Sequence, residues 1–157
     1  PSRCGIEIST STVARLHEKY PHVRALKEAG GRSSKVSETV CALGDDFVTL
    51  SGDDGLTLPF MACGAKGVIS VASNLIPSVV SQLVRLALDG DYERARVLHL
   101  ENYQLFNDLF CEPNPVPVKT LMQLKGLISS AQVRLPLTPP SSSNSELLGK
   151  ITDKLSL

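Results

Sequence analysis

The chain has 157 residues with 16 basic and 16 acidic side chains and no basic run, which argues against nucleic acid or an anionic membrane surface as a partner. Hydrophobic residues make up 42% of the chain, aromatic residues only 4%, and Trp is absent, so we expect one domain with an aliphatic core. No apolar run approaches the roughly 20 residues that a membrane helix needs.

The four cysteines are widely spaced and form no C-x-x-C pair, which disfavours a structural zinc site. Separate thiols are typical of a reducing compartment, and the sequence therefore predicts a cytoplasmic globular chain without a metal. The cysteines are Cys4, Cys41, Cys63 and Cys111.

The first half of the chain alternates helical and strand patterns. The predicted elements are a helix over residues 9–20, a strand over 23–29, a helix from Ser33 or Ser34 to 43, a strand over 47–51, a helix over 56–63 and a strand over 67–72. Helix followed by strand, repeated three times with short connections, is typical of parallel β/α units. Strands this apolar need cover on both faces, which favours a doubly covered sheet or a barrel.

After Ala72 the pattern is only helical. The predicted elements are a helix capped by Asn74 that runs to about 89, a helix capped by Asp91, a stiff extended connector over 112–117, a helix over 118–128, a surface connector over 135–144 and a weaker helix over 145–155. We therefore divide the chain into residues 1–74, the C-terminal half of a barrel, and residues 75–157, the last barrel helix and a C-terminal helical region.

Three parallel strands cannot close a β/α barrel, which needs eight. They would also leave two open sheet edges, which soluble proteins avoid. The expected fold class is therefore α/β, the second half of a (β/α)8 TIM barrel or of an open α/β sheet, followed by a helical extension. The chain begins at Pro1 without an initiator Met, and we expect a fragment of a longer polypeptide.

Lys27 is the candidate catalytic residue. Active groups of α/β folds lie at the C-terminal ends of the strands, and Lys27 lies at such an end. Strand alternation places Ala25, Lys27 and Ala29 on one face and Leu26 and Glu28 on the other, so the lysine has only small neighbours on its own face. A dry pocket there would lower the pKa of the ammonium and leave a nucleophilic amine able to form an imine with a carbonyl compound. The alternative is a solvated lysine at a strand end.

The second strand end carries Gly52, where a larger side chain would crowd a neighbour, followed by Asp53 and Asp54. Two adjacent carboxylates without histidine make a poor metal site. We expect them instead to cap the following helix and to complement its dipole.

The other polar residues are weaker candidates for a functional site. His22 lies at a strand entrance, His17 and His99 lie within helices, and no Ser/His/Asp arrangement is evident. The turn at residues 30–32 could bind a phosphate, although a plain tight turn is the simpler interpretation. Arg3 lies in a loop on the same rim as Lys27 and could bind a substrate carboxylate, or be a surface residue.

Five motifs in order give the chain a resemblance to a known family. They are P-S-R-C-G at residues 1–5, L-K-E-A at 26–29, L-S-G-D-D at 50–54, G-V-I-S-V at 67–71 and E-P-N-P-V-P-V-K at 112–119. Together they resemble the second half of the dihydrodipicolinate synthase (4-hydroxy-tetrahydrodipicolinate synthase) family, within the N-acetylneuraminate lyase superfamily. The first and last motifs point to the synthase.

The resemblance implies a class I aldolase-type lyase on a TIM barrel that condenses pyruvate with aspartate-4-semialdehyde, in diaminopimelate and lysine biosynthesis. Lys27 would form the Schiff base with pyruvate, and Arg3 would bind substrate carboxylate. The backbones of Gly52 and Ile69 would line the pyruvate pocket. No cofactor is implied.

The chain departs from the family pattern at two positions. Cys4 stands where Thr is usual, and Gly30 stands where Thr or Ser is usual, so each position loses a hydroxyl near the rim. By the resemblance, the tyrosine and threonine proton relay would lie upstream of Pro1. The family is commonly tetrameric, which implies a homo-oligomer, a tetramer or dimer formed together with that upstream half.

Two alternatives stay open. The chain could belong to another pyruvate lyase or aldolase of the superfamily, with a sugar-acid substrate. It could also be a non-catalytic half-barrel, a fragment or interaction module, because no relay residues are recognised in it.

Overall fold

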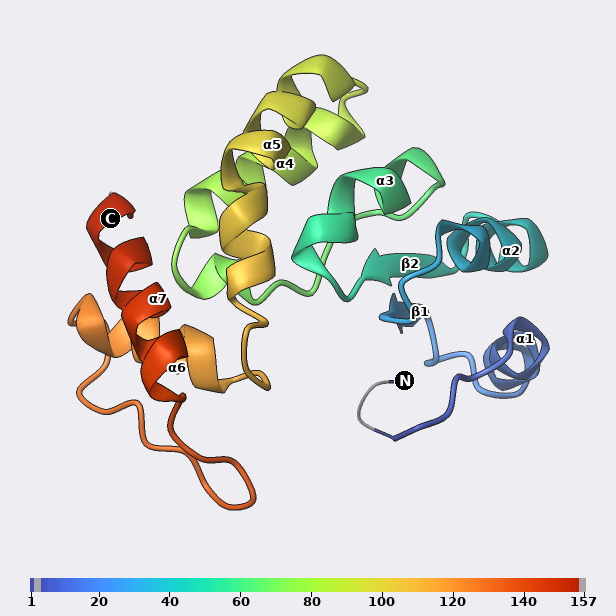
Figure 1. Ribbon diagram of the computed structural model, residues 1–157. Coiled ribbons are helices and arrows are strands. Elements are labelled where there is room, and N and C mark those ends of the chain that lie inside the picture. The colour runs from blue at the N-terminus through green and yellow to red at the C-terminus, as the bar shows by residue number, and fades with distance from the viewer. Residues whose placement is uncertain (2–3, 156–157) are drawn as a thin grey trace.

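The computed structural model describes residues 1 and 4–155, and its elements follow one another along an open arc from α1 to α7 (Figure 1). The candidate Arg3 lies outside the described residues. In order, the elements are α1 Thr10–Lys19, β1 Ala25–Glu28, α2 Ser33–Leu43, β2 Val48–Ser51, η1 Asp54–Leu56, α3 Thr57–Ala62, η2 Ala72–Asn74, α4 Pro77–Leu88, α5 Tyr92–Asp108, α6 Val116–Leu124 and α7 Ser142–Lys154, where η denotes a 3₁₀ helix.

The helix and strand alternation of the first half is confirmed. Strands β1 and β2 pair in parallel with Lys27 opposite Leu50, and α2 connects them. Ser9 caps α1 by accepting from the Thr12 N–H, and α2 ends at Gly44, whose φ of 65° is a conformation that glycine adopts without strain. The fold is thus of the α/β class, with the parallel β/α units expected of part of a barrel.

The predicted third strand is wrong in its extent. The segment after α3 forms one parallel bridge with β2, between Ser51 and Val68, and the Lys66 N–H also donates to the Thr49 carbonyl. The chain then turns, because the Ser70 Oγ accepts from the Ser73 N–H at 2.8 Å and Ala72 already begins η2. The high content of β-branched residues predicted a longer strand, but these local polar contacts end it after Ile69.

The stiff connector predicted over residues 112–117 is also shorter than expected. Helix α6 begins at Val116, whose N–H donates to the Pro113 carbonyl, and Pro117 lies within its first turn. Proline is tolerated there because the first-turn N–H groups have no partner within the helix. The last helix, α7, begins at Ser142, three residues before the predicted start.

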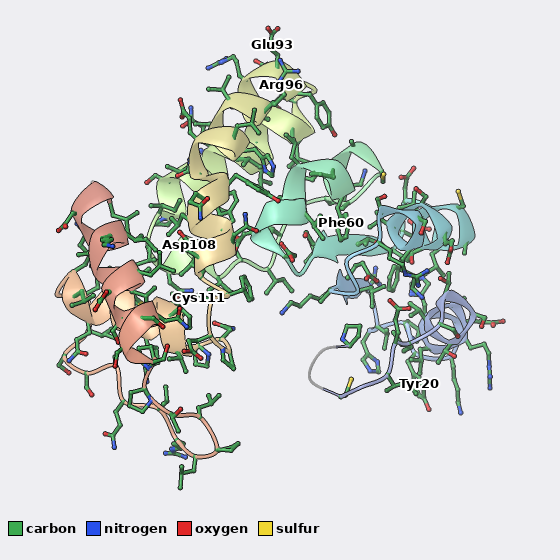
Figure 2. All side chains as sticks on the ribbon, viewed as in Figure 1. Tyr20, Phe60, Glu93, Arg96, Asp108 and Cys111 are labelled. Carbon is green, nitrogen blue, oxygen red and sulfur yellow. The ribbon has the colours of Figure 1, made fainter. Side chains whose placement is uncertain are left out.

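Two apolar clusters hold the helices together. One joins α2, α3, α4 and α5 around Phe60, which Figure 2 shows on α3, and the other joins α4, α5, α6 and α7 around Leu109, Leu121 and Leu148. The predicted division after residue 74 falls at the end of η2 and stays a prediction. Within the described part of the chain, no helix combines the length and apolarity needed to cross a membrane.

His99 on α5 gives a first testable expectation. Its side chain is 8% exposed, lies against the rings of Tyr103 and Phe106, and its Nδ1 has no hydrogen-bond partner among the described residues. Burial lowers the pKa of His99 below the ordinary 6.5, because the charged form is poorly solvated. The stabilisation from a neutral His99 is therefore complete above pH 6.5 and declines as the pH falls below that value.

We expect His99→Leu to remove this part of the pH dependence. Urea unfolding between pH 8 and pH 5 should show a shallower decline of the free energy of unfolding in His99→Leu than in the wild type. The control is His22→Gln, because His22 is exposed. An equal decline in His99→Leu and the wild type would contradict the assignment.

Candidate active site

Lys27 is the third residue of β1, and the predicted alternation of exposed and buried side chains around it is confirmed. Ala25, Lys27 and Ala29 are exposed, whereas Glu28 is buried and Leu26 is partly buried. The side chain of Lys27 lines an open pocket of about 680 Å³ together with Ala29. The lysine therefore faces a pocket between small neighbours, as the sequence predicted.

Gly52 allows the ends of β1 and β2 to lie close together. A Cβ atom at this position would lie 2.9 Å from the Lys27 Cε and 2.8 Å from the Ala29 Cβ, closer than carbon atoms pack. The N–H of Gly52 donates to the Glu28 carbonyl at 2.7 Å, so its backbone is held against β1. The lysine occupies its place in the pocket because position 52 carries no side chain.

The pocket wall also contains residues that the sequence reasoning did not assign to the site. Val71 joins Gly52 from the segment after the bridge, and a second stretch comes from the loop after α5, where Figure 2 shows Cys111. The loop residues that line the pocket are Phe110, Cys111, Glu112, Pro113 and Asn114. The sequence signal for this wall is Asn114 between two prolines, with Glu112 just before them, because proline restricts the backbone and holds the polar side chains in place.

Ile69 is not among the residues that line the pocket with Lys27 and Gly52. Its side chain is 47% exposed, and its N–H donates to the Ser51 carbonyl at 2.8 Å. Its role in substrate binding stays a prediction.

Asp53 and Asp54 have separate structural roles. The Asp53 carboxylate caps η1 by accepting from the N–H groups of Gly55 and Leu56, as predicted. The carboxylate of Asp54, which is 3% exposed, accepts from the N–H groups of Val71 and Ala72 at 2.9 and 3.0 Å. Both carboxylates are thus used by backbone donors, and no cluster of three metal-ligating side chains occurs in residues 1 and 4–155.

Asp54 therefore fixes Val71 in the pocket wall. Removing the Asp54 carboxylate should lower the free energy of unfolding. We expect Asp54→Ala to lower the free energy of unfolding by about 3 kcal/mol, because the buried Ala72 N–H and the partly buried Val71 N–H lose a charged acceptor. Urea denaturation measures the loss, and Asp46→Ala at an exposed position is the control. Equal stability of the two variants would show that the Val71 and Ala72 contacts contribute little.

The turn after β1 is occupied by carboxylates and does not resemble a phosphate cradle. Gly31 has a φ of 80°, typical of a tight turn, and the Gly30 N–H already donates to the buried Glu28 carboxylate at 2.6 Å. Glu7 approaches from the segment before α1 and pairs with Arg32 at 2.7 Å. A Cβ atom at Gly30 would lie 2.1 Å from the Glu7 Oε1 and 2.7 Å from the Glu28 Oε1. Negative charge around this turn disfavours a phosphate.

An array of parallel β/α units with a lysine at the end of a strand, facing a pocket, defines part of an α/β barrel of the type that carries its active site at the C-terminal ends of the strands. The Dihydrodipicolinate synthetase family model matches residues 1–155. The chain belongs to this family.

Similar proteins support this placement over the whole chain. The 4-hydroxy-tetrahydrodipicolinate synthase of Sulfurihydrogenibium sp. (strain YO3AOP1) is 50% identical over 157 residues, which are 100% of this chain and 54% of that protein. The crystal structure of dihydrodipicolinate synthase from Aquifex aeolicus superposes with a TM-score of 0.95 at 46% identity, covering 98% of this chain and 52% of that chain.

A third relative was solved with a ligand. The chloride-inhibited dihydrodipicolinate synthase from Acinetobacter baumannii, complexed with pyruvate, superposes with a TM-score of 0.91 at 34% identity and covers 99% of this chain and 54% of that chain. The chain spans about half the length of the relatives it matches.

Proposed function

We propose that the protein containing this chain is a 4-hydroxy-tetrahydrodipicolinate synthase that condenses pyruvate with aspartate-4-semialdehyde, in diaminopimelate and lysine biosynthesis. The observation that carries the proposal is the position of Lys27 at a strand end. Its side chain lines a pocket in which Gly52, having no side chain, leaves room for the lysine. Family membership and a pyruvate complex of a similar protein support the choice of substrate.

The chemistry assigned to Lys27 is imine formation. Its neutral Nζ attacks the carbonyl carbon of pyruvate, and loss of water leaves a Schiff base. Loss of a proton from the pyruvate methyl group then gives an enamine, and its terminal carbon attacks the aldehyde carbon. The amino group of the aldehyde substrate then attacks the imine carbon, which closes the ring and releases the lysine as a free amine. The backbones of Gly52 and Ile69 are proposed to line the pyruvate pocket, and Arg3 is proposed to bind a substrate carboxylate.

These residues form only part of the proposed site. Lys27 is exposed in the described chain, and an imine-forming lysine needs walls that exclude bulk water. We assign the remaining walls and the groups that move protons to the other half of the barrel found in the relatives. The C-terminal helices from α4 onward are proposed to be the last barrel helix and a helical extension.

The proposal also includes self-association and location. Val97, Leu100 and Tyr103 on α5 are exposed, and a row of exposed apolar side chains supports a homo-oligomer, a tetramer or dimer. The four cysteines are free thiols, which supports a cytoplasmic location.

Borohydride trapping tests the proposed function. Full-length protein incubated with pyruvate and borohydride should gain one reduced pyruvyl group on the peptide that contains Lys27, as read by mass spectrometry. Protein treated with borohydride alone is the control. An unmodified Lys27 would overturn the proposal. Product analysis with aspartate-4-semialdehyde and with sugar-acid aldehydes separates the synthase from another pyruvate lyase.

A further inference from the structure

Helix α7 is attached to the pocket loop through one carboxylate. The Oε1 atom of Glu112 accepts from the Ser141 N–H at 3.1 Å and from the Asn144 Nδ2 at 2.8 Å. Ser141 is the N-cap residue of α7, and Asn144 lies in its first turn. The contact joins segments that are 29 and 32 positions apart, so it is tertiary rather than local.

Asn144 makes a second contact to the same loop. Its Nδ2 also donates to the Cys111 carbonyl at 3.3 Å, so one amide group holds both a side chain and the backbone of the loop. Helix α7 is itself anchored, because Leu148 is fully buried in the cluster with α4, α5 and α6. Helix α7 therefore supplies a fixed hydrogen-bond donor, and this donor holds Cys111 and Glu112 of the loop in place.

The loop held in this way is a wall of the Lys27 pocket. Cys111 and Glu112 line the pocket together with Lys27 and Gly52. Pro113, between Glu112 and Asn114, restricts the backbone, so a shift at Glu112 is carried along the wall. The two hydrogen bonds also hold the pKa of Glu112 below its ordinary 4.5, because they favour the charged carboxylate.

We propose that Glu112 and Asn144 are positioning residues for pyruvate binding, and that α7 supports the active site by fixing the wall at residues 110–114. This inference rests on the proposed function. Neither residue takes part in bond making. They act through the position of the wall, and so they affect the KM for pyruvate more than the rate of the chemical step.

The test replaces the donor by a second carboxylate. In full-length protein, Asn144→Asp places two carboxylates within hydrogen-bond distance, and at pH 8 their repulsion should release the wall and raise the KM for pyruvate about tenfold relative to the wild type. Asn144→Ala loses the donor without adding a charge, so its KM for pyruvate should also rise, but by less than that of Asn144→Asp. The kcat of both variants should stay close to that of the wild type, because neither Glu112 nor Asn144 takes part in bond making.

Asn107→Asp is the matched control, because it makes the same charge change at an exposed position of α5. A general loss of stability would reduce the amount of active enzyme and so the apparent kcat, but it would leave the KM for pyruvate unchanged. A KM for Asn144→Asp that equals the wild-type value at pH 8 overturns the proposal.

Amide hydrogen exchange separates this inference from the proposed function, because it needs no substrate. At one fixed pH of 8, residues 110–114 should exchange about tenfold faster in Asn144→Asp than in the wild type, while β1 and α2 exchange at unchanged rates. Wild-type protein that fails to trap pyruvate contradicts the proposed function, whereas unchanged exchange at residues 110–114 contradicts the role of Asn144. Should Asn144→Asp not fold, Asn144→Ala provides the same exchange comparison.

Discussion

Lys27→Ala in the full-length protein is expected to reduce the rate of condensation by at least about 10³-fold and to abolish borohydride trapping of pyruvate. The methyl group of alanine cannot form a Schiff base, and within the described chain Lys27 is the lysine that lines the pocket next to Gly52. Because the Lys27 side chain forms no hydrogen bond or ion pair with the rest of the described chain, the variant should unfold at close to the same urea concentration as the wild type. Steady-state kinetics and urea unfolding measure the two effects.

Two further variants test whether Lys27 acts as a nucleophile or only through its charge. Lys27→Arg keeps the positive charge but should be as inactive as Lys27→Ala, because a guanidinium stays protonated and is a poor nucleophile. Lys66→Ala, at an exposed position, should retain wild-type activity. If Lys27→Arg retains substantial activity, the lysine acts through its charge and covalent catalysis is refuted.

The second large effect is expected at Gly52. Gly52→Ala brings a methyl group within 2.9 Å of the Lys27 Cε and 2.8 Å of the Ala29 Cβ, so the lysine or the strand end must move. A displacement of the nucleophile by about 1 Å can cost about 10²-fold in rate, and overpacking of this kind costs about 1–3 kcal/mol of stability. The rate of pyruvate trapping and the free energy of unfolding should both fall.

Gly149→Ala is the matched control for Gly52→Ala. A Cβ at Gly149 has no neighbour within 4 Å, and the residue lies within α7. Alanine is favoured over glycine inside a helix, so this variant should be slightly more stable, by up to about 1 kcal/mol, with wild-type activity. Equal behaviour of the two variants would mean that the contact between Gly52 and Lys27 is not constrained.

Local pattern predicted the part of the site that lies on one strand. Alternation along β1 placed Lys27 on a face with Ala25 and Ala29, and the order of helices and strands placed its end at the rim. Gly52 was also recognised, because a glycine just after a parallel strand indicates close approach to a neighbour. These inferences depend on periodicity and strand direction, which short stretches of sequence encode.

The rest of the pocket depends on contacts between distant segments. Val71 lines the pocket because the chain turns at Ser70 and because the Asp54 carboxylate holds its N–H. Neither contact is visible in the run of β-branched residues that predicted a longer strand. The loop wall after α5 lies more than 80 residues from Lys27. No local pattern brings these segments together.

The carboxylates of Glu7 and Glu28 limit which substitutions Gly30 can accept. Serine or threonine at position 30 would place its Cβ 2.1 Å from the Glu7 Oε1, and Glu7 is held there by Arg32. A serine or threonine at position 30 therefore requires the ends of the Glu7 and Glu28 side chains to move. Positions 7 and 30 form an epistatic pair, because a smaller residue at position 7 would leave only the Glu28 carboxylate to be displaced by a substitution at Gly30.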